Sequence, residues 1–186
     1  MNGLRLTARM ATQGDSFEAL DEKTYTLNST DIGIYNGDTL VGLGGIMGGE
    51  TTAVDENTTD ILLEAAHFDK DVIASTGQRL MILSEARHRF ERGVDAHSSV
   101  NFGAVAARLI TDICGGDIKG QAVTGEAPAE SRKVTFDTTR METFAGFAVE
   151  TSECESILTK LGFTVKATGG SILEVTPPTS VSYTHL

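Results

Sequence analysis

Glu64 stands in the middle of a short, mostly apolar run, DILLEAAHF at residues 60–68. A carboxylate with apolar neighbours needs hydrogen-bond partners, or its pKa rises. Glu64 is therefore a candidate for a binding or catalytic site, and the alternative is a glutamate on the solvent-facing side of an amphipathic element. His67, three positions on, fits a packed or exposed histidine better than a ligand.

A second candidate is the stretch GLGGIMGGE, residues 42–50, which has five glycines in nine positions. Consecutive glycine N–H groups can cradle a phosphate, but no Gly-Lys-Ser/Thr follows, and the next residues are polar rather than the start of an apolar helix. The alternative is a tight turn in which backbones pack closely because side chains are absent.

The densest charge cluster is SEARHRFERGVDAH, residues 84–97, with Arg87, His88, Arg89 and Arg92 as its basic members. Such a cluster suits an RNA end or a carboxylate neighbour. Alternatively, a network of ion pairs closes a loop here; its members would be Arg89, Glu91, Arg92 and Asp95. No Ser/His/Asp or Cys/His arrangement can be argued from spacing, and metal-ligand spacing is absent.

Composition limits the class of protein. The chain has 186 residues, 40% hydrophobic and 22% charged, with a net charge of −11. Its apolar runs are too short to span a bilayer, and its N-terminal residues lack the apolar core of a secretory signal. Its cysteines, Cys114 and Cys154, are too few for a disulfide framework, so the cytoplasm is the expected location. The acidic balance argues against a free-standing nucleic-acid binder, DNA included.

The elements that must position these residues can be read from periodicity. Residues 4–46 alternate in a β-rich pattern, with a tight hairpin turn at Asn36-Gly37. Residues 60–68 fit a buried strand or the start of a helix. Asp69 caps a helix over residues 69–80, and a longer helix from about residue 96 to 114 stops at Gly115-Gly116.

A polar stretch without periodicity, residues 117–133, predicts a linker with a domain boundary near residue 127. Beyond it we expect a strand at 134–136, a short helix at 138–144 and a hairpin over 163–176. Ser152 and Glu155 form a capping box that opens a helix ended by Gly162. The chain is thus predicted to be α+β, with units at residues 1–126 and 127–186.

The three motifs GLGGIMGGE, TTDILLEAAHF and SEARHRFERGVD, in this order and at these separations, resemble the beta subunit of bacterial phenylalanyl-tRNA synthetase. The similarity is to its third and fourth domains, a mixed β-sheet with packed helices that edits mischarged tRNA. Residues from about Lys133 to Pro178 resemble the start of the small domain that follows. The resemblance implies a chain that is incomplete at both ends.

This resemblance implies a role for Glu64, which would recognise the phenol of a wrongly attached tyrosine. An apolar pocket rejects an added hydroxyl poorly, so a second site must find that group, and a carboxylate gains a hydrogen bond only with tyrosine. Gly48, Ser84 (where Thr is usual) and Ala86 would form the pocket walls. Hydrolysis would rely on a positioned water, so no catalytic residue is assigned.

The resemblance also implies partners. The whole enzyme attaches phenylalanine to its tRNA with ATP and Mg²⁺, in a heterotetramer of two alpha and two beta subunits, with the synthetic site in the alpha subunit. This stretch would contact the acceptor end of tRNA(Phe) and hold no cofactor or metal of its own.

The sequence departs from the family in several places. Arg87 replaces a common Ser, Thr51-Thr52 a His-Ser and Ala96 a Pro. The editing-site histidine of the family lies in a Gly-Gln-Pro-Leu-His-like motif upstream of residues 4–11, and this sequence does not contain that motif. Two alternatives stay open: a non-catalytic RNA- or protein-binding module of the same fold, and an unrelated sugar- or peptide-binding α+β domain.

Overall fold

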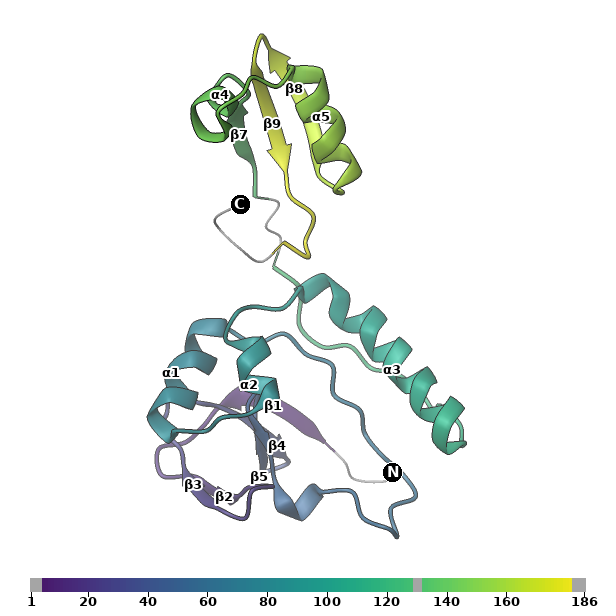
Figure 1. The fold of residues 1–186 in the computed structure, drawn as a ribbon. Coiled ribbons are helices and arrows are strands. Elements are labelled where there is room, and N and C mark those ends of the chain that lie inside the picture. Colours follow the sequence, from purple (N-terminus) through teal and green to yellow (C-terminus); the bar gives the residue numbers. More distant parts are fainter. Residues whose placement is uncertain (1–4, 129–131, 182–186) are drawn as a thin grey trace. The chain divides into compact units, whose positions relative to one another are not determined.

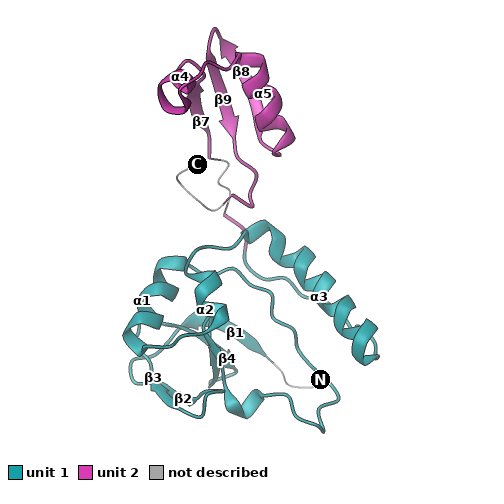
Figure 2. Cartoon of the chain, viewed as in Figure 1, with its two compact units in different colours: residues 1–125 teal, residues 126–186 magenta. Residues whose placement is uncertain are grey.

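The computed structural model describes residues 5–128 and 132–181. The chain forms two compact units, residues 1–125 and 126–186, and the division lies one residue before the predicted boundary. Figure 2 shows the two units in different colours. Each combines helices with antiparallel strand pairs, which confirms the α+β class. No helix in the described ranges is long and apolar enough to cross a membrane.

Unit 1 is built on an antiparallel sheet with the strand order β1-β4-β5-β6 (Figure 1). These strands are β1 (Leu6–Met10), β4 (Ile32–Asn36), β5 (Thr39–Leu43) and β6 (Met47–Gly48). A separate pair is formed by β2 (Ser16–Glu18) and β3 (Thr24–Thr26). The β-rich character predicted for residues 4–46 is confirmed.

The hairpin between β4 and β5 lies where it was predicted, but its turn is one residue later. Asn36 pairs with Thr39, so Gly37 and Asp38 form the loop. Only Gly37 has a positive φ, +60°, and Asn36 keeps a strand conformation. The reason is that the Asn36 side chain accepts a hydrogen bond of 3.1 Å from the Arg5 N–H, which fixes it in the sheet beside β1.

The helices of unit 1 are α1 (Lys70–Leu80), α2 (Glu85–Phe90) and α3 (Ser99–Cys114), with short 3₁₀ turns η1 (Glu50–Thr52) and η2 (Ala96–Ser98). Asp69 caps α1 as predicted, accepting from the N–H groups of Asp71 and Val72 at 2.9 and 3.1 Å. Gly115, with φ +77°, ends α3 as predicted.

One core cluster joins the sheet of unit 1 to α1 and α2. Its fully buried members include Leu27, Leu43, Ile46, Ile73 and Ile82. Phe68 packs against Phe90 with ring centroids 5.3 Å apart in an edge-to-face arrangement, the geometry that aromatic pairs prefer. These contacts fix the start of α1 and the end of α2 over the glycine-containing turn that follows β5.

A buried carboxylate also ties α1 to the strands. Asp31, 1% exposed, accepts a 2.7 Å hydrogen bond from the Thr76 hydroxyl and pairs with Arg79. The Asn28 N–H donates a further 2.6 Å bond to the same carboxylate. A buried charge needs such partners, and here they connect the loop before β4 to α1.

Two elements of unit 1 differ from the expectations. Residues 60–68 form neither a strand nor a helix, and run as an irregular segment toward α1. The helix α3 begins at Ser99, after η2, rather than near residue 96, and none of its residues is fully buried.

Unit 2 contains a three-stranded antiparallel sheet with the order β7-β9-β8. Its elements are β7 (Val134–Asp137), α4 (Arg140–Ala145), α5 (Thr151–Lys160), β8 (Thr164–Gly169) and β9 (Ile172–Thr176). The core consists of Cys154, Leu173 and Val175. The strand, short helix and hairpin predicted after residue 133 are confirmed.

The predicted capping box of α5 is wrong. The helix begins at Thr151 with Glu150 as its N-cap residue, and no side chain caps it, so Ser152 and Glu155 lie inside the helix. The tertiary contact that fixes this start is a 2.8 Å hydrogen bond between the hydroxyls of Thr151 and the buried Thr138.

Candidate functional site

The glycine loop, residues 42–49, is packed against the aromatic pair of the core. A Cβ added at Gly44 would lie 3.1 Å from the Phe68 ring, and one at Gly45 would lie 2.9 Å from the same ring. A Cβ at Gly49 would lie 2.5 Å from the Val41 carbonyl oxygen. At these three positions, glycine is required because backbones and rings approach too closely for any side chain, as the tight-turn alternative predicts.

Gly48, predicted as a pocket wall, is exposed and sits in a different environment. Its carbonyl accepts a 3.1 Å hydrogen bond from the Leu20 N–H, and a Cβ added to it would lie 3.0 Å from Cδ1 of Leu20. A methyl group added at Gly48 would therefore point toward Leu20. No atom of Glu64, Ser84 or Ala86 is among the neighbours that such a methyl group would meet.

Ser84 joins the glycine loop to α2. Its hydroxyl donates a 2.6 Å hydrogen bond to the Ile46 carbonyl and accepts one of 3.1 Å from the Arg87 N–H, so Ser84 is the N-cap of α2. One small hydroxyl thus satisfies a helix N–H and fixes the loop. The structure brings these two predicted parts of the site together, and Ala86 lies exposed on the first turn of α2.

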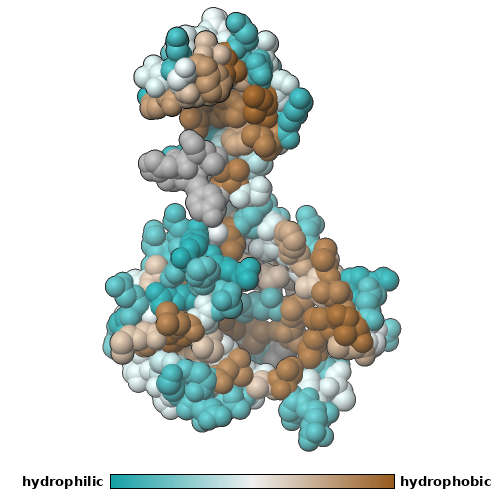
Figure 3. Space-filling model, viewed as in Figure 1, coloured by the Kyte–Doolittle hydropathy of each residue, from teal (hydrophilic) through white to brown (hydrophobic). Residues whose placement is uncertain are grey.

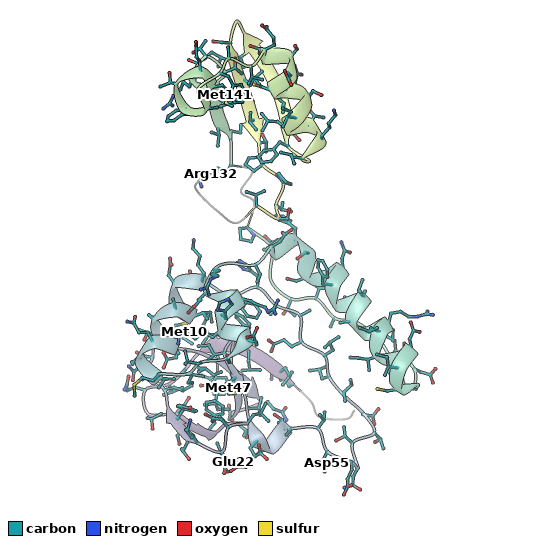
Figure 4. The ribbon with its side chains drawn as sticks, in the orientation of Figure 1. Met10, Glu22, Met47, Asp55, Arg132 and Met141 are labelled. Atoms are coloured by element: carbon teal, nitrogen blue, oxygen red, sulfur yellow. The ribbon has the colours of Figure 1, made fainter. Side chains whose placement is uncertain are left out.

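Glu64 lies on the irregular segment between η1 and α1. The Cβ of the next residue, Ala65, would lie 3.1 Å from a Cβ placed on Gly103 of α3, whereas Ala66 packs against the core cluster. Glu64 itself is exposed, one residue before the one that meets α3 and two before the one that packs on the core. In Figure 4, the stretch that runs from Asp55 towards α1 carries side chains on both sides of its backbone.

The Glu64 carboxylate has no protein partner in the part of the chain that the structure describes. Although the residue is exposed, protein atoms around it displace water, and this desolvation raises the pKa of the Glu64 carboxyl above its ordinary value. Within residues 5–128 and 132–181, no hydrogen bond or ion pair to Glu64 is present. A carboxylate in this state can accept a hydrogen bond from a ligand hydroxyl without first giving up a protein partner.

The basic cluster is largely occupied by its own ion pairs. Arg87 donates to Glu91 at 2.9 Å and to the Ile82 carbonyl at 2.6 Å, and its side chain is only 15% exposed. Arg92 binds the same Glu91 at 3.1 Å, as the predicted network requires. Arg89, however, pairs with Glu85 rather than with the predicted members.

Arg87 is the centre of this network, a role that the sequence reasoning did not assign to it. The signal was available in the four-residue spacing of Arg87 with Glu91, which places oppositely charged side chains on one helix face. Asp95 accepts a 2.9 Å hydrogen bond from the His97 N–H and caps η2.

Comparison with known proteins places the chain in a family. Residues 1–115 match the sequence model of the B3/4 domain. The chain belongs to the B3/4 domain family. A second match, to the tRNA synthetase B5 domain, covers residues 134–180. The B3/4 match therefore falls within unit 1 and the B5 match within unit 2.

Individual relatives agree with this assignment. The chain is 43% identical over 178 residues to the phenylalanine–tRNA ligase beta subunit of Rhodospirillum rubrum, covering 96% of this chain and 22% of that protein. The corresponding protein of Nitrobacter winogradskyi is 41% identical over 94% of this chain and 21% of its own length. The beta subunit of Brucella abortus is 38% identical over 92% of this chain and 21% of its own length. The chain spans about a fifth of the length of these relatives.

The B3/4 domain therefore carries all the predicted site residues. Ser84 is hydrogen-bonded to the glycine loop, Ala86 lies on the first turn of α2, and the exposed Glu64 lies on a segment that forms no backbone hydrogen bonds in the described part of the chain. Among the described residues, no cluster of three or more His, Cys, Asp or Glu side chains could hold a metal ion. The chemistry that this arrangement offers is hydrogen bonding by an oxygen acceptor in a partly apolar setting.

Proposed function

We propose that this chain is the B3/4 and B5 portion of a phenylalanine–tRNA ligase beta subunit, and that its B3/4 domain hydrolyses tyrosyl-tRNA(Phe). The whole enzyme attaches phenylalanine to tRNA(Phe) with ATP and Mg²⁺, in the cytoplasm, as a heterotetramer with alpha subunits that carry the synthetic site. The names of the relatives, each a phenylalanine–tRNA ligase beta subunit, support this assignment.

The observation that carries the editing proposal is the state of Glu64. Its carboxyl has a raised pKa because of desolvation and has no partner in the described part of the chain. Tyrosine differs from phenylalanine by one phenolic hydroxyl, which can donate to this carboxylate, and phenylalanine has no donor to offer. A hydrogen bond to a charged group is worth about 1.5–3 kcal/mol, or about 10- to 150-fold in selectivity.

The other site residues have supporting roles in this proposal. Ser84 holds the glycine loop against the start of α2 through its bond to Ile46, and Ala86 leaves room beside them for an aromatic ring. The water that attacks the ester is positioned by substrate and backbone groups, because the sequence offers no activated nucleophile. The acceptor end of tRNA(Phe) delivers the tyrosyl ester.

A chimaeric beta subunit tests the proposal. This chain would replace the matching 178-residue stretch of the Rhodospirillum rubrum subunit, which would be purified with its alpha subunit. We expect hydrolysis of tyrosyl-tRNA(Phe) at least about 10-fold faster than that of phenylalanyl-tRNA(Phe). The Glu64→Ala change should remove this difference, and the control Glu56→Ala, on the same exposed segment, should keep it. Equal preference for tyrosine in both variants would exclude Glu64 as the recognising group.

A second candidate function is a non-catalytic module of the same fold that binds tRNA or protein. It is favoured by the residues of the site, among which no Ser/His/Asp or Cys/His arrangement supplies an activated nucleophile. In the chimaera, binding of tyrosyl-tRNA(Phe) with hydrolysis no faster than in buffer would identify this function in place of editing.

A further inference from the structure

One aromatic ring anchors the long segment that carries Glu64. Within residues 50–72, all of which the structure describes, Phe68 is the only buried residue, at 7% exposure. Figure 3 shows hydrophobic residues at the surface of unit 1. The large apolar side chains that lie nearest before Phe68 are 42–54% exposed; they are Ile61, Leu62 and Leu63. Burial therefore holds this segment mainly at its end, through Phe68.

The Phe68 ring packs directly against the glycine loop. A Cβ placed on Gly44 or Gly45 would lie only 3.1 or 2.9 Å from ring atoms of Phe68, so the ring touches the bare backbone of both glycines. The loop itself is fixed to the sheet, because the Gly44 N–H donates a 2.8 Å hydrogen bond to the Ile32 carbonyl. Close-packed contacts of this kind transmit a displacement from one element to the next.

Glu64 lies four residues before this ring on a backbone that has little else to fix it. A span of four residues reaches at most about 14 Å when fully extended. Residues 59–68 make no backbone hydrogen bond in the described part of the chain, and between Glu64 and Phe68 only Ala66 packs against the core, with a single methyl group. The position of Glu64 relative to the glycine loop therefore depends on where the Phe68 ring sits.

We propose that Phe68 is a positioning residue for the recognition of tyrosine. Its ring, seated against Gly44 and Gly45, sets the distance between Glu64 and the glycine loop, and it acts through Glu64 without contacting the substrate. This inference rests on the proposed function, in which Glu64 accepts the phenolic hydroxyl. A displaced carboxylate weakens that one hydrogen bond and leaves unchanged the ester chemistry that the tyrosyl and phenylalanyl substrates share.

The substitution Phe68→Leu in the chimaeric subunit tests this role through kcat/KM for the two esters. The preference for tyrosyl-tRNA(Phe), at least about 10-fold in the unsubstituted chimaera, should fall to about 3-fold or less. The loss should come from slower hydrolysis of the tyrosyl ester, with the phenylalanyl ester changed by less than about 2-fold, because phenylalanine makes no hydrogen bond to Glu64.

Phe17→Leu is the matched control. Phe17 is also 7% exposed and belongs to the same core cluster, but it lies on β2 beside Tyr25 and is not among the nearest neighbours of a Cβ on Gly44 or Gly45. The control should lose stability and keep the preference for tyrosine. An equal loss of preference in the two variants would show a general effect of core packing and would overturn the positioning role.

A second variant, Phe68→Met, applies if the leucine variant does not fold. It keeps a large apolar side chain and replaces the rigid ring by a flexible one, so it should lower the preference to about 3-fold as well. In the Glu64→Ala background, neither Phe68 variant should change the ratio of the two rates by more than about 2-fold. A larger change there would mean that Phe68 acts independently of Glu64, contrary to the positioning role.

A measurement without catalysis separates this inference from the proposed function. In the 186-residue chain, NMR of the glutamate carboxyl carbons follows the titration of Glu64, and Glu64→Gln identifies its signal. Phe68→Leu should lower the raised pKa of Glu64 toward its ordinary value, because a loosened segment admits water, and Phe17→Leu should not. This result with a chimaera that shows no preference for tyrosine would refute editing and leave the positioning of Glu64 intact. A preference that survives both Phe68 variants would overturn the positioning role and leave editing intact.

Discussion

Gly77 and Arg87 should be energetically coupled, because the side chain of Arg87 occupies the space that a methyl group at Gly77 would need. Gly77 is a buried residue inside α1, and an added Cβ would clash with Cδ and Nε of Arg87 on α2. Arg87 cannot easily retreat, since it is bonded to Glu91 at 2.9 Å and to the Ile82 carbonyl at 2.6 Å. Gly77→Ala must therefore displace Arg87 from both partners.

The magnitude follows from opposing effects. Replacing glycine by alanine inside a helix stabilises a protein by about 0.5–1 kcal/mol when the site is free. Losing two charge-assisted hydrogen bonds at a site that keeps 15% exposure costs about 2–3 kcal/mol. Gly77→Ala should thus destabilise unit 1 by about 1–2 kcal/mol in the wild-type background. In the Arg87→Ala background, the same change should be neutral or stabilising by up to about 1 kcal/mol.

Urea unfolding measures this coupling in a double-mutant cycle. The chain has no tryptophan, and Tyr25 and Tyr35 lie within unit 1, so tyrosine fluorescence reports the unfolding of this unit. The expected coupling free energy is about 1–3 kcal/mol. If Gly77→Ala changed the unfolding free energy equally with and without Arg87, the two side chains would not compete for the same space.

Three further predictions concern individual side chains of unit 1. Ser84→Ala should lower the free energy of unfolding, measured with urea, by about 1–2 kcal/mol, because it removes the cap of α2 and the hydrogen bond to Ile46. Ser84→Thr keeps the hydroxyl and should lower it little, so equal losses in the two variants would contradict the role of the hydroxyl. Asp31→Asn should lower the free energy of unfolding in the same assay by about 2–3 kcal/mol, because it leaves Arg79 unpaired at a site where the carboxylate is 1% exposed. A decrease of less than about 0.5 kcal/mol would refute this role of the ion pair. Desolvation raises the pKa of Glu64 in the folded state, so its contribution to stability is complete below the ordinary glutamate pKa and is lost as the pH rises through the folded value. Glu64→Gln should therefore raise the Tm at pH 7 relative to the wild type and not at pH 3.5, and the reverse pattern would refute the desolvation.

Local signals in the sequence predicted the elements that depend on local contacts. Asp69 caps α1 and Gly115 ends α3, because both effects act within one helical turn. The turn after Asn36 and the start of α5 were misplaced by a residue or more. In both cases a contact from a distant part of the chain decides the outcome: Arg5 holds Asn36, and Thr138 holds Thr151.

The candidate site could be predicted from the sequence only in part. The hydrogen bond between Ser84 and the glycine loop joins residues 38 positions apart. The resemblance to a known family suggested that these two parts lie together, but the spacing of residues in the sequence could not. The direction of Gly48 toward Leu20 has no signal in the sequence, because a glycine gives no pattern of burial. The exposure of α3 was equally hidden, since its apolar periodicity is that of a packed helix.

The backbone around Glu64 is held differently from the rest of the proposed site. Ser84 and the glycine loop are held by hydrogen bonds and core packing, but Glu64 lies on a backbone that has no hydrogen bonds from residue 59 to 68 in the described part of the chain. A carboxylate that discriminates through a single hydrogen bond must be held in place, because a mobile acceptor loses to solvent part of what it gains from the ligand. The selectivity of Glu64 for tyrosine should therefore depend on how firmly residues 59–68 are held, as well as on the carboxylate itself.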